Sequence, residues 1–222
     1  MADLLVTGTD TAVGKTLIAA ALLLELRARG VRAVGFKPVE SGVDPAEPAD
    51  SDLLGRASGI DEPLARPLLR LAEPLAPAVA ADRAGQALEP ADVHARVDAL
   101  RVAGYRVVVE GAGGLRVPLA WGYTALDLAA EAGLSALIVA RTGLGTLNHV
   151  VLTAEALSAR NVPLLGVILN GRGDPPDLAE QTNPAALARL LPGVHVLVTP
   201  RLAAGGLEGA ALLRPVLASV LV

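Results

Sequence analysis

The sequence predicts an α/β protein with a doubly wound, mostly parallel sheet and helices on both faces. Apolar segments of strand length alternate with segments of helical pattern along the chain, which is typical of this architecture. The strand-like segments are continuously apolar, as strands buried on both faces are. The first of them leads through a glycine loop directly into a helix. The 222 residues are expected to form one domain, residues 1–222, with a substantial core.

The composition limits the possible classes of function. Hydrophobic residues make up 52% and charged residues 19% of the chain, which indicates an ordered globular protein. The net charge of −4 does not favour nucleic acid as a partner, and the absence of cysteine excludes disulfides and thiol chemistry. The first residues lack the basic segment of a signal peptide, and no run approaches the ~18 apolar residues of a membrane span. We therefore expect a cytoplasmic protein without a membrane segment.

Residues 3–16, DLLVTGTDTAVGKT, have the layout of a phosphate-binding loop. A short apolar strand ends at Gly8, a loop of small residues follows, and Gly-Lys-Thr at 14–16 opens a helix that continues through residues 17–24. The backbone N–H groups of such a loop and the dipole of the helix both favour a bound anion. Five residues separate Gly8 from Gly14 instead of the usual four, so the loop is a lengthened variant.

Lys15 and Lys37 are the only lysines among 19 basic residues, and all the others are arginine. Within the loop, Lys15 is placed to reach the β- and γ-phosphates of a nucleotide, and the Thr16 hydroxyl to ligate Mg²⁺. An arginine does not replace a compact ammonium that must meet one phosphate or one developing charge. Lys37 follows the strand at 31–36 and hence lies at the carboxyl edge of the sheet, where ligands bind in this fold. Both lysines are therefore candidate functional residues.

Three carboxylates are candidate metal ligands. The strand at 106–110 ends in Glu110, and an acid at the end of a buried strand near a phosphate loop binds or orients Mg²⁺. The glycines at 111–114 permit close approach of the backbone to a substrate. Asp50 and Asp52 precede the helix at 53–58, where each is interpretable either as a helix N-cap or as a metal ligand.

The remaining segments continue the alternation of strands and helices. Prolines between residues 60 and 90 predict a loop or short helix over one end of the sheet. Thr146 is a candidate N-cap, and the helix that it opens offers a second place for an anion. Asn170 ends a strand and is a candidate either for contact with a nucleobase or for a turn. Further helices are predicted at 90–103, 123–132, 146–159, 183–191 and from near Leu207, and further strands at 135–140, 164–170 and 194–198.

Seven motifs together resemble those of the dethiobiotin synthetases, a family of P-loop NTPase-like enzymes. They occur in the order of the family and cover nearly the whole chain. The lengthened loop, the Lys-Pro strand end and the Glu-Gly-Ala-Gly-Gly segment are quite specific in combination. The matching motifs are GTDTAVGKT at 8–16, GFKPVESG at 35–42, SD at 51–52, AEPLAP at 72–77, VEGAGGL at 109–115, LGTLNH at 144–149 and VILNG at 167–171.

The resemblance implies an ATP-dependent ligase of biotin synthesis. Its substrates would be 7,8-diaminononanoate, CO₂ and Mg-ATP, and its products dethiobiotin, ADP and phosphate. One amine and CO₂ would form a carbamate, whose oxygen attacks the γ-phosphate to give a carbamic–phosphoric anhydride. The second amine would then displace phosphate and close a cyclic urea. The family also implies a homodimer with its substrate site at the subunit interface.

Roles for particular residues also follow from the resemblance. Lys37, Lys15 and Thr11 would be catalytic, and Mg²⁺ would be held by Thr16, Asp52 and Glu110. The diamine and carbamate would contact Thr11, Lys37, Ser41, Pro74, Gly111, Gly113, Leu144 and Asn148, the last two from the second subunit. The nucleotide would contact Ala12, Val13, Gly14, Lys15, Thr16, Leu17, Asp52, Glu110, Gly113, Asn170, Gly171, Pro200, Arg201 and Leu202.

One departure and two rival classes bear on this interpretation. Ala12 stands where many family members carry an acid beside the nucleotide, so the choice of nucleoside triphosphate stays open. Partitioning or positioning ATPases of the same fold typically carry a second lysine early in the loop, where this chain has Thr9 and Asp10. Amide-forming ligases of the cobyrinate type carry a fused amidotransferase domain, for which the chain has neither the length nor a cysteine nucleophile.

Overall fold

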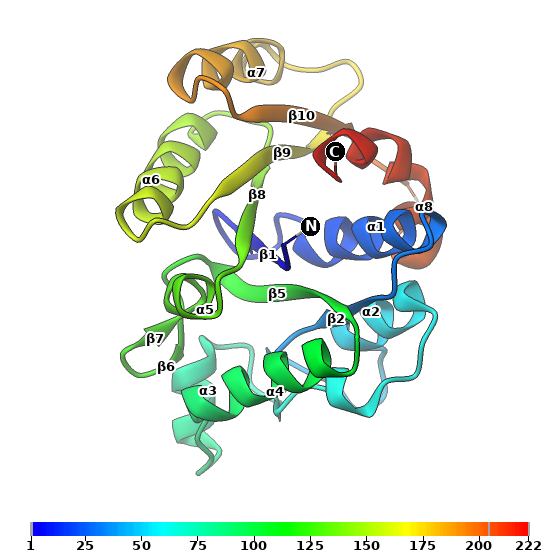
Figure 1. The fold of residues 1–222 in the computed structure, drawn as a ribbon. Helices are drawn as coiled ribbons and strands as arrows, with labels where there is room; N and C mark the ends of the chain where they lie inside the picture. Colours follow the sequence, from blue (N-terminus) through cyan, green and yellow to red (C-terminus); the bar gives the residue numbers. More distant parts are fainter. Residues whose placement is uncertain (1, 204, 222) are drawn as a thin grey trace.

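A computed structural model describes residues 2–203 and 205–221 of the chain. Six parallel strands form its central sheet, in the order β10-β9-β8-β1-β5-β2 (Figure 1). This arrangement confirms the predicted α/β fold. Because β1 lies between β8 and β5, the loop that follows β1 has the ends of both neighbouring strands beside it. The strands are β1 (Leu4–Gly8), β2 (Ala33–Phe36), β5 (Arg106–Gly114), β8 (Ser135–Arg141), β9 (Leu164–Arg172) and β10 (His195–Pro200).

Helices cover both faces of the sheet, because alternate residues of each strand point to opposite sides (Figure 1). On β1, Leu4 and Val6 belong to the core beneath α1, α2 and α8, whereas Leu5 belongs to the core beneath α4, α5 and α6. No helix within the described ranges is long and apolar enough to cross a membrane. The bounds are α1 (Lys15–Ala28), α2 (Asp50–Ser58), α4 (Pro90–Val102), α5 (Ala125–Ala132), α6 (Thr146–Ala159) and α8 (Gly206–Leu217).

The helix α7 (Leu178–Leu190) begins five residues earlier than predicted. A reciprocal pair of hydrogen bonds fixes its start: Asp177 Oδ1 accepts from the Glu180 backbone N–H at 2.8 Å, and Glu180 Oε2 accepts from the Asp177 N–H at 3.1 Å. This capping box satisfies two backbone donors at the helix start. A start at residue 183 would put Pro184 in the first turn, where proline is favoured, but the structure places it inside the helix.

Two boundaries near the site also differ from those predicted. Helix α2 begins at Asp50 instead of 53, so Asp50 and Asp52 lie in its first turn, and β5 continues through the glycine segment to Gly114. The cap of α6 is Gly145, and the Thr146 hydroxyl donates instead to the Arg141 carbonyl at 2.7 Å. The remaining elements are β3 (Val39–Ser41), η1 (Pro63–Ala65), β4 (Leu69–Leu71), α3 (Pro77–Arg83), β6 (Pro118–Ala120), β7 (Tyr123–Thr124) and η2 (Ala218–Leu221).

Gly14 lies at the point where the phosphate loop approaches strand β9 most closely. It caps α1 in the left-handed region, with φ of 94°. A Cβ at this position would lie 2.0 Å from Nδ2 of Asn170, which lies near the carboxyl end of β9. That amide nitrogen donates to the Val13 carbonyl at 2.9 Å, so β9 is bonded to the loop at the point of closest approach. Glycine is therefore required at position 14 for both the backbone conformation and the contact.

We expect Gly14→Ala to destabilise the protein more than Gly30→Ala. Both glycines have positive φ, but among the described residues no atom lies within 4 Å of a Cβ built at Gly30. Gly30→Ala therefore measures the backbone cost alone, roughly 1 kcal/mol, whereas Gly14→Ala also displaces the Asn170 amide. Urea unfolding of both variants measures the difference. Equal losses would contradict the packing role, and Asn170→Ala should cost less in the Gly14→Ala background than in the parent.

Candidate active site

The carboxyl ends of β1, β2 and β5 meet at one edge of the sheet, where a cavity of about 710 Å³ opens. Parallel register places Phe36 of β2 beside Val109 of β5, so the residues that follow them, Lys37 and Glu110, also lie together. The loop after β1 forms another wall. Ten of the predicted site residues line this cavity: Thr11, Ala12, Gly14, Lys15, Thr16, Lys37, Ser41, Pro74, Glu110 and Gly113.

The Lys37 ammonium lies between two carboxylates at the wall of the cavity. It donates to Glu110 Oε1 at 2.9 Å and also forms an ion pair with Asp50. The side chain is only 9% exposed. Burial acts to lower the pKa of Lys37, but the Glu110 and Asp50 carboxylates outweigh burial and hold the pKa above its ordinary value. Lys37 is thus a fixed positive charge at the place that the sequence predicted.

Glu110 is 1% exposed, and its two oxygens have different surroundings. Oε1 accepts from the Thr16 hydroxyl at 2.8 Å as well as from Lys37. Oε2 is buried without a hydrogen-bond partner in residues 2–203 and 205–221. Burial raises the pKa of Glu110, and Lys37 opposes that rise. A hard cation beside the Thr16 hydroxyl would supply Oε2 with a partner, so these oxygens fit Mg²⁺.

The described part of the chain contains no group of three or more His, Cys, Asp and Glu side chains able to hold a metal. Mg²⁺ does not need such a group, because it is usually held by one or two carboxylates together with substrate phosphates and water.

Lys15 is folded back onto its own loop. Its ammonium donates to the Asp10 carbonyl at 3.1 Å, and the side chain is buried. Burial lowers the pKa of Lys15, Glu110 opposes this effect, and the positive charge of Lys37 adds to it. An anionic phosphate in the loop would reverse the balance, because it would offer the ammonium an opposite charge.

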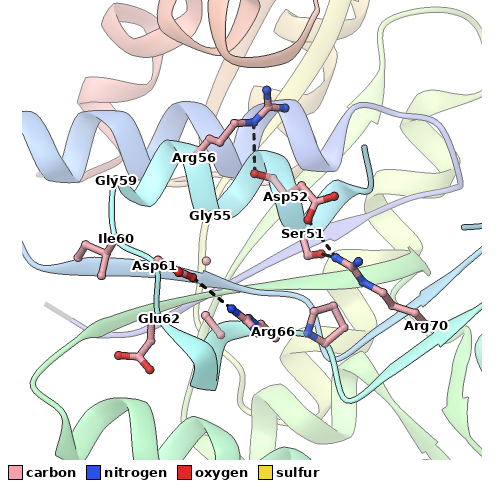
Figure 2. A pocket seen from close by; sticks show the side chains of 13 residues that line it. Ser51, Asp52, Gly55, Arg56, Gly59, Ile60, Asp61, Glu62, Arg66 and Arg70 are labelled. Atoms are coloured by element: carbon pink, nitrogen blue, oxygen red, sulfur yellow. Dashed lines mark hydrogen bonds and ion pairs between the residues drawn. The ribbon is translucent and has the colours of Figure 1, made fainter. Parts of the chain in front are cut away.

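The two candidate carboxylates of α2 face different cavities. Asp50 faces Lys37 and lines the 710 Å³ cavity. Asp52 instead lines a neighbouring cavity of about 820 Å³, shown in Figure 2, where Arg70 Nη2 donates to its Oδ1 at 3.1 Å. Its Oδ2 accepts from the Ala49 backbone N–H at 2.8 Å. Asp50 thus shares the cavity of Thr16 and Glu110, whereas Asp52, the predicted metal ligand, faces Arg70.

A smaller hollow of about 410 Å³ lies on the other side of the phosphate loop. Leu144, Asn170, Gly171 and Arg201 line it, together with Thr9 of the loop. Asn170 is already bonded on both sides of its amide, since Oδ1 accepts from the Thr199 hydroxyl at 2.6 Å and Nδ2 donates to Val13. Sequence reasoning missed this support of the loop; the polar residues Asn170 and Thr199 at neighbouring strand ends were the available signal.

The other predicted contact residues lie outside both hollows. Val13 is buried in the core beneath α1, and Leu17 and Leu202 pack against that core. Gly111 is buried in β5, where a Cβ would lie 3.3 Å from Ala125. Pro200 ends β10, whereas Asn148 is exposed on α6. Leu144, by contrast, lines the smaller hollow and is 95% exposed in the loop before α6.

The parallel sheet and the loop between β1 and α1 give the chain a P-loop NTPase-like α/β fold, and solved structures share this fold. The septum site-determining protein MinD complexed with Mg-ADP from Pyrococcus horikoshii OT3 matches with a TM-score of 0.59 and 18% identity, over 96% of this chain and 86% of that one. Apo McdA of Cyanothece matches with a TM-score of 0.54 and 16% identity, over 97% and 90%. At these identities the likeness concerns the fold alone. Residues 2–204 also match the AAA domain family model.

The sequence relatives are more specific. An ATP-dependent dethiobiotin synthetase of Anaeromyxobacter sp. (strain K) is 50% identical over 191 residues, which are 86% of each chain. A second enzyme of that name, from Mycobacterium sp. (strain JLS), is 43% identical over 197 residues, or 86% of this chain and 85% of its own. The chain belongs to the ATP-dependent dethiobiotin synthetases, a family of ligases. The resemblance in the motifs is thereby confirmed.

Proposed function

We propose that this protein uses ATP to carboxylate 7,8-diaminononanoate and to close the cyclic urea of dethiobiotin. The observation that carries the proposal is Lys37, a buried ammonium at the wall of the cavity that also contains the phosphate loop. Membership of the family supports the choice of substrates. The cavity suits an amphipathic diamine, because the polar Thr11 and Ser41 share it with an apolar set of Val39, Pro74, Leu75, Pro77, Ala112 and Val117.

In the proposed reaction, one amine of the substrate adds to CO₂ and loses a proton to give a carbamate. A carbamate oxygen then attacks the γ-phosphorus of ATP, the bond to ADP breaks, and a carbamic–phosphoric anhydride forms. The second amine attacks the carbonyl carbon, phosphate leaves, and a proton is released as the ring closes. Charge develops between carbamate and γ-phosphate, where a preorganised cation stabilises the transition state most.

Each lysine has a separate task in this proposal. Lys37 holds the carbamate and stabilises the charge that develops during transfer, since its ammonium is already fixed by Glu110 and Asp50. Lys15 leaves the Asp10 carbonyl to neutralise the β- and γ-phosphates. Thr11 donates a hydrogen bond to the carbamate from the loop. Thr16 and Glu110 would hold Mg²⁺, which would supply charge neutralisation at the phosphates.

The nucleotide would extend along the loop toward the 410 Å³ hollow. Val13, Gly14 and the first turn of α1 through Leu17 would surround its phosphates, with Gly113 on the opposite strand. Asn170, Gly171, Pro200, Arg201 and Leu202 lie at the ends of β9 and β10, on the side where the base would be held. Ala12 gives the nucleotide no charged neighbour from position 12. We propose a cytoplasmic enzyme with neither nucleic acid nor a membrane as partner.

Phosphate release from ATP tests this function, measured with and without 7,8-diaminononanoate and bicarbonate. We expect release to require both. Lys37→Ala should lower kcat by roughly 10²-fold or more, because Lys37 acts on charge present only in the transition state. The Kd for ATP, measured by calorimetry, should change much less. Release that is independent of the diamine would contradict the proposed reaction, and an unchanged kcat would remove Lys37 from it.

We propose that a carboxylate of the first turn of α2 completes the Mg²⁺ site of Thr16 and Glu110. The family resemblance assigns Asp52, whereas the present geometry favours Asp50. We expect Asp50→Asn to raise the Mg²⁺ concentration for half-maximal phosphate release by roughly tenfold, the usual effect of weakening a metal site. Asp52→Asn serves as the matched control two residues away. The opposite order would show that Asp52 exchanges Arg70 for the metal during binding.

A homodimer is the proposed assembly, with Leu144 and Asn148 reaching the substrate site of the partner. Leu144 is almost fully exposed, and Asn148 lies in the first turn of α6, where backbone N–H groups and the helix dipole favour an anion. Within one subunit, β8 lies on the opposite side of β1 from β5, which separates this helix start from Lys37. A two-fold axis would bring the substrate carboxylate to the helix start of the other subunit.

Mixed dimers test the shared site. A Lys37→Ala chain and an Asn148→Ala chain should each be nearly inactive as homodimers. When they are mixed, one site per mixed dimer keeps both residues, so activity should return to about half of the parental value per mixed dimer. Native mass spectrometry verifies subunit exchange. Verified exchange without recovery of activity would show that Asn148 does not act across the interface.

A further inference from the structure

The N-cap residue of helix α2 has no side chain that can cap the helix. The first turn of this helix contains Asp50, which pairs with Lys37. Its N-cap position is Ala49, which has no side-chain acceptor. The Ser51 backbone N–H instead donates to Glu40 Oε1 at 2.6 Å, and the Ser51 hydroxyl donates to Glu40 Oε2 at 2.9 Å. Glu40 belongs to β3, three residues after Lys37. A carboxylate from another element therefore caps the helix that approaches the site.

Arg70 compensates the charge of Glu40. The carboxylate is 3% exposed, so it requires a positive partner as well as hydrogen bonds. Arg70 Nε lies 3.1 Å from Glu40 Oε2, because β3 and β4 pair in parallel with Glu40 directly opposite Arg70. The same guanidinium reaches α2, where Nη2 donates to the Ser51 hydroxyl at 2.6 Å and to Asp52 Oδ1 at 3.1 Å (Figure 2).

These contacts give the first turn of α2 two attachments to the segment that follows β2. Lys37 binds Asp50 on the side of the active-site cavity, and Glu40 binds the next residue of the helix, Ser51. Arg70 holds Asp52 on the side of the 820 Å³ cavity. Adjacent residues of one helical turn are thus bound in different directions, which fixes the rotation of the turn about the helix axis.

We propose that Glu40 and Arg70 are positioning residues of the active site, which hold the first turn of α2 so that Asp50 stays beside Lys37 and Glu110. Neither contacts the nucleotide or the diamine in the proposed function, on which this inference rests. They act through Ser51 and Asp52. Loss of Arg70 would leave the Glu40 anion buried with neutral donors alone, and the turn would lose its fixed orientation.

The test measures how Mg²⁺ promotes binding of the non-hydrolysable analogue AMP-PNP, by calorimetry over a series of Mg²⁺ concentrations. Arg70→Ala should raise the Mg²⁺ concentration for half-maximal binding by roughly fivefold, which corresponds to the net contribution of about one ordinary hydrogen bond. Arg70→Lys keeps the charge but not the planar fork, so its shift should be smaller but measurable. If Arg70→Ala does not fold, as judged by circular dichroism, Arg70→Lys gives the result.

Two further variants separate positioning from general stability. Arg66→Ala removes an arginine from the same 820 Å³ cavity, but the ion-pair partner of Arg66 is Asp61, which lies outside α2. The Mg²⁺ dependence of AMP-PNP binding should therefore equal that of the parent protein. As a single variant, Glu40→Gln should weaken the Mg²⁺-dependent binding of AMP-PNP. Added to Arg70→Ala it should weaken this binding little further, because it removes the anion that Arg70→Ala leaves unpaired.

The inference is overturned if Arg70→Ala and Arg66→Ala give the same Mg²⁺ dependence, if Arg70→Ala binds Mg²⁺ more tightly, or if the Glu40 and Arg70 effects add fully. Since AMP-PNP binding needs no turnover, each of these results can be read in a protein that proves inactive with the diamine. Diamine-dependent phosphate release by the parent, measured in parallel, reports on the proposed function separately.

Discussion

The geometry of the site depends on one buried carboxylate. Glu110 lies at the end of β5 with almost no exposed surface, and an ion in such a place is stable only when it is paired and hydrogen-bonded. Its two donors come from separate elements, Thr16 from the start of α1 and Lys37 from the end of β2. The requirement to satisfy one charge therefore holds the phosphate loop and the neighbouring strand at a fixed separation.

The charged groups of the site differ in how completely they are paired. One oxygen of Glu110 is satisfied, whereas the other has no partner among residues 2–203 and 205–221. Likewise, Lys15 is satisfied only by a neutral carbonyl of its own loop. In the proposed function, a phosphate of ATP would pair with the Lys15 ammonium, and a metal ion would pair with Oε2 of Glu110. Binding of Mg-ATP would satisfy both at once, which favours the complex over either ligand alone.

Support for these groups comes from outside the cavity. On one side, Asn170 of β9 bonds to the Val13 carbonyl next to Gly14, and Thr199 of β10 orients its amide. On the other side, β3 and β4 cap the helix that carries Asp50. Every polar side chain in these two supports is bonded to another, so the loop and α2 are held by networks and not by single contacts.

The sequence by itself determined the fold class, the phosphate loop and the cluster of Lys15, Thr16, Lys37 and Glu110. These follow from local rules: continuous apolar segments alternate with helices, and polar residues that directly follow parallel strands must meet at one edge. Helix α7 begins five residues before its predicted start, because the capping box of Asp177 and Glu180 extends the helix on the N-terminal side of Pro184. Only the tertiary structure shows that Asp50 faces Lys37 whereas Asp52 faces Arg70, since both lie in one helical turn and the contacts with Lys37, Glu40 and Arg70 set its rotation. Those partners are distant in sequence, and no periodic pattern specifies which of two neighbouring carboxylates they select.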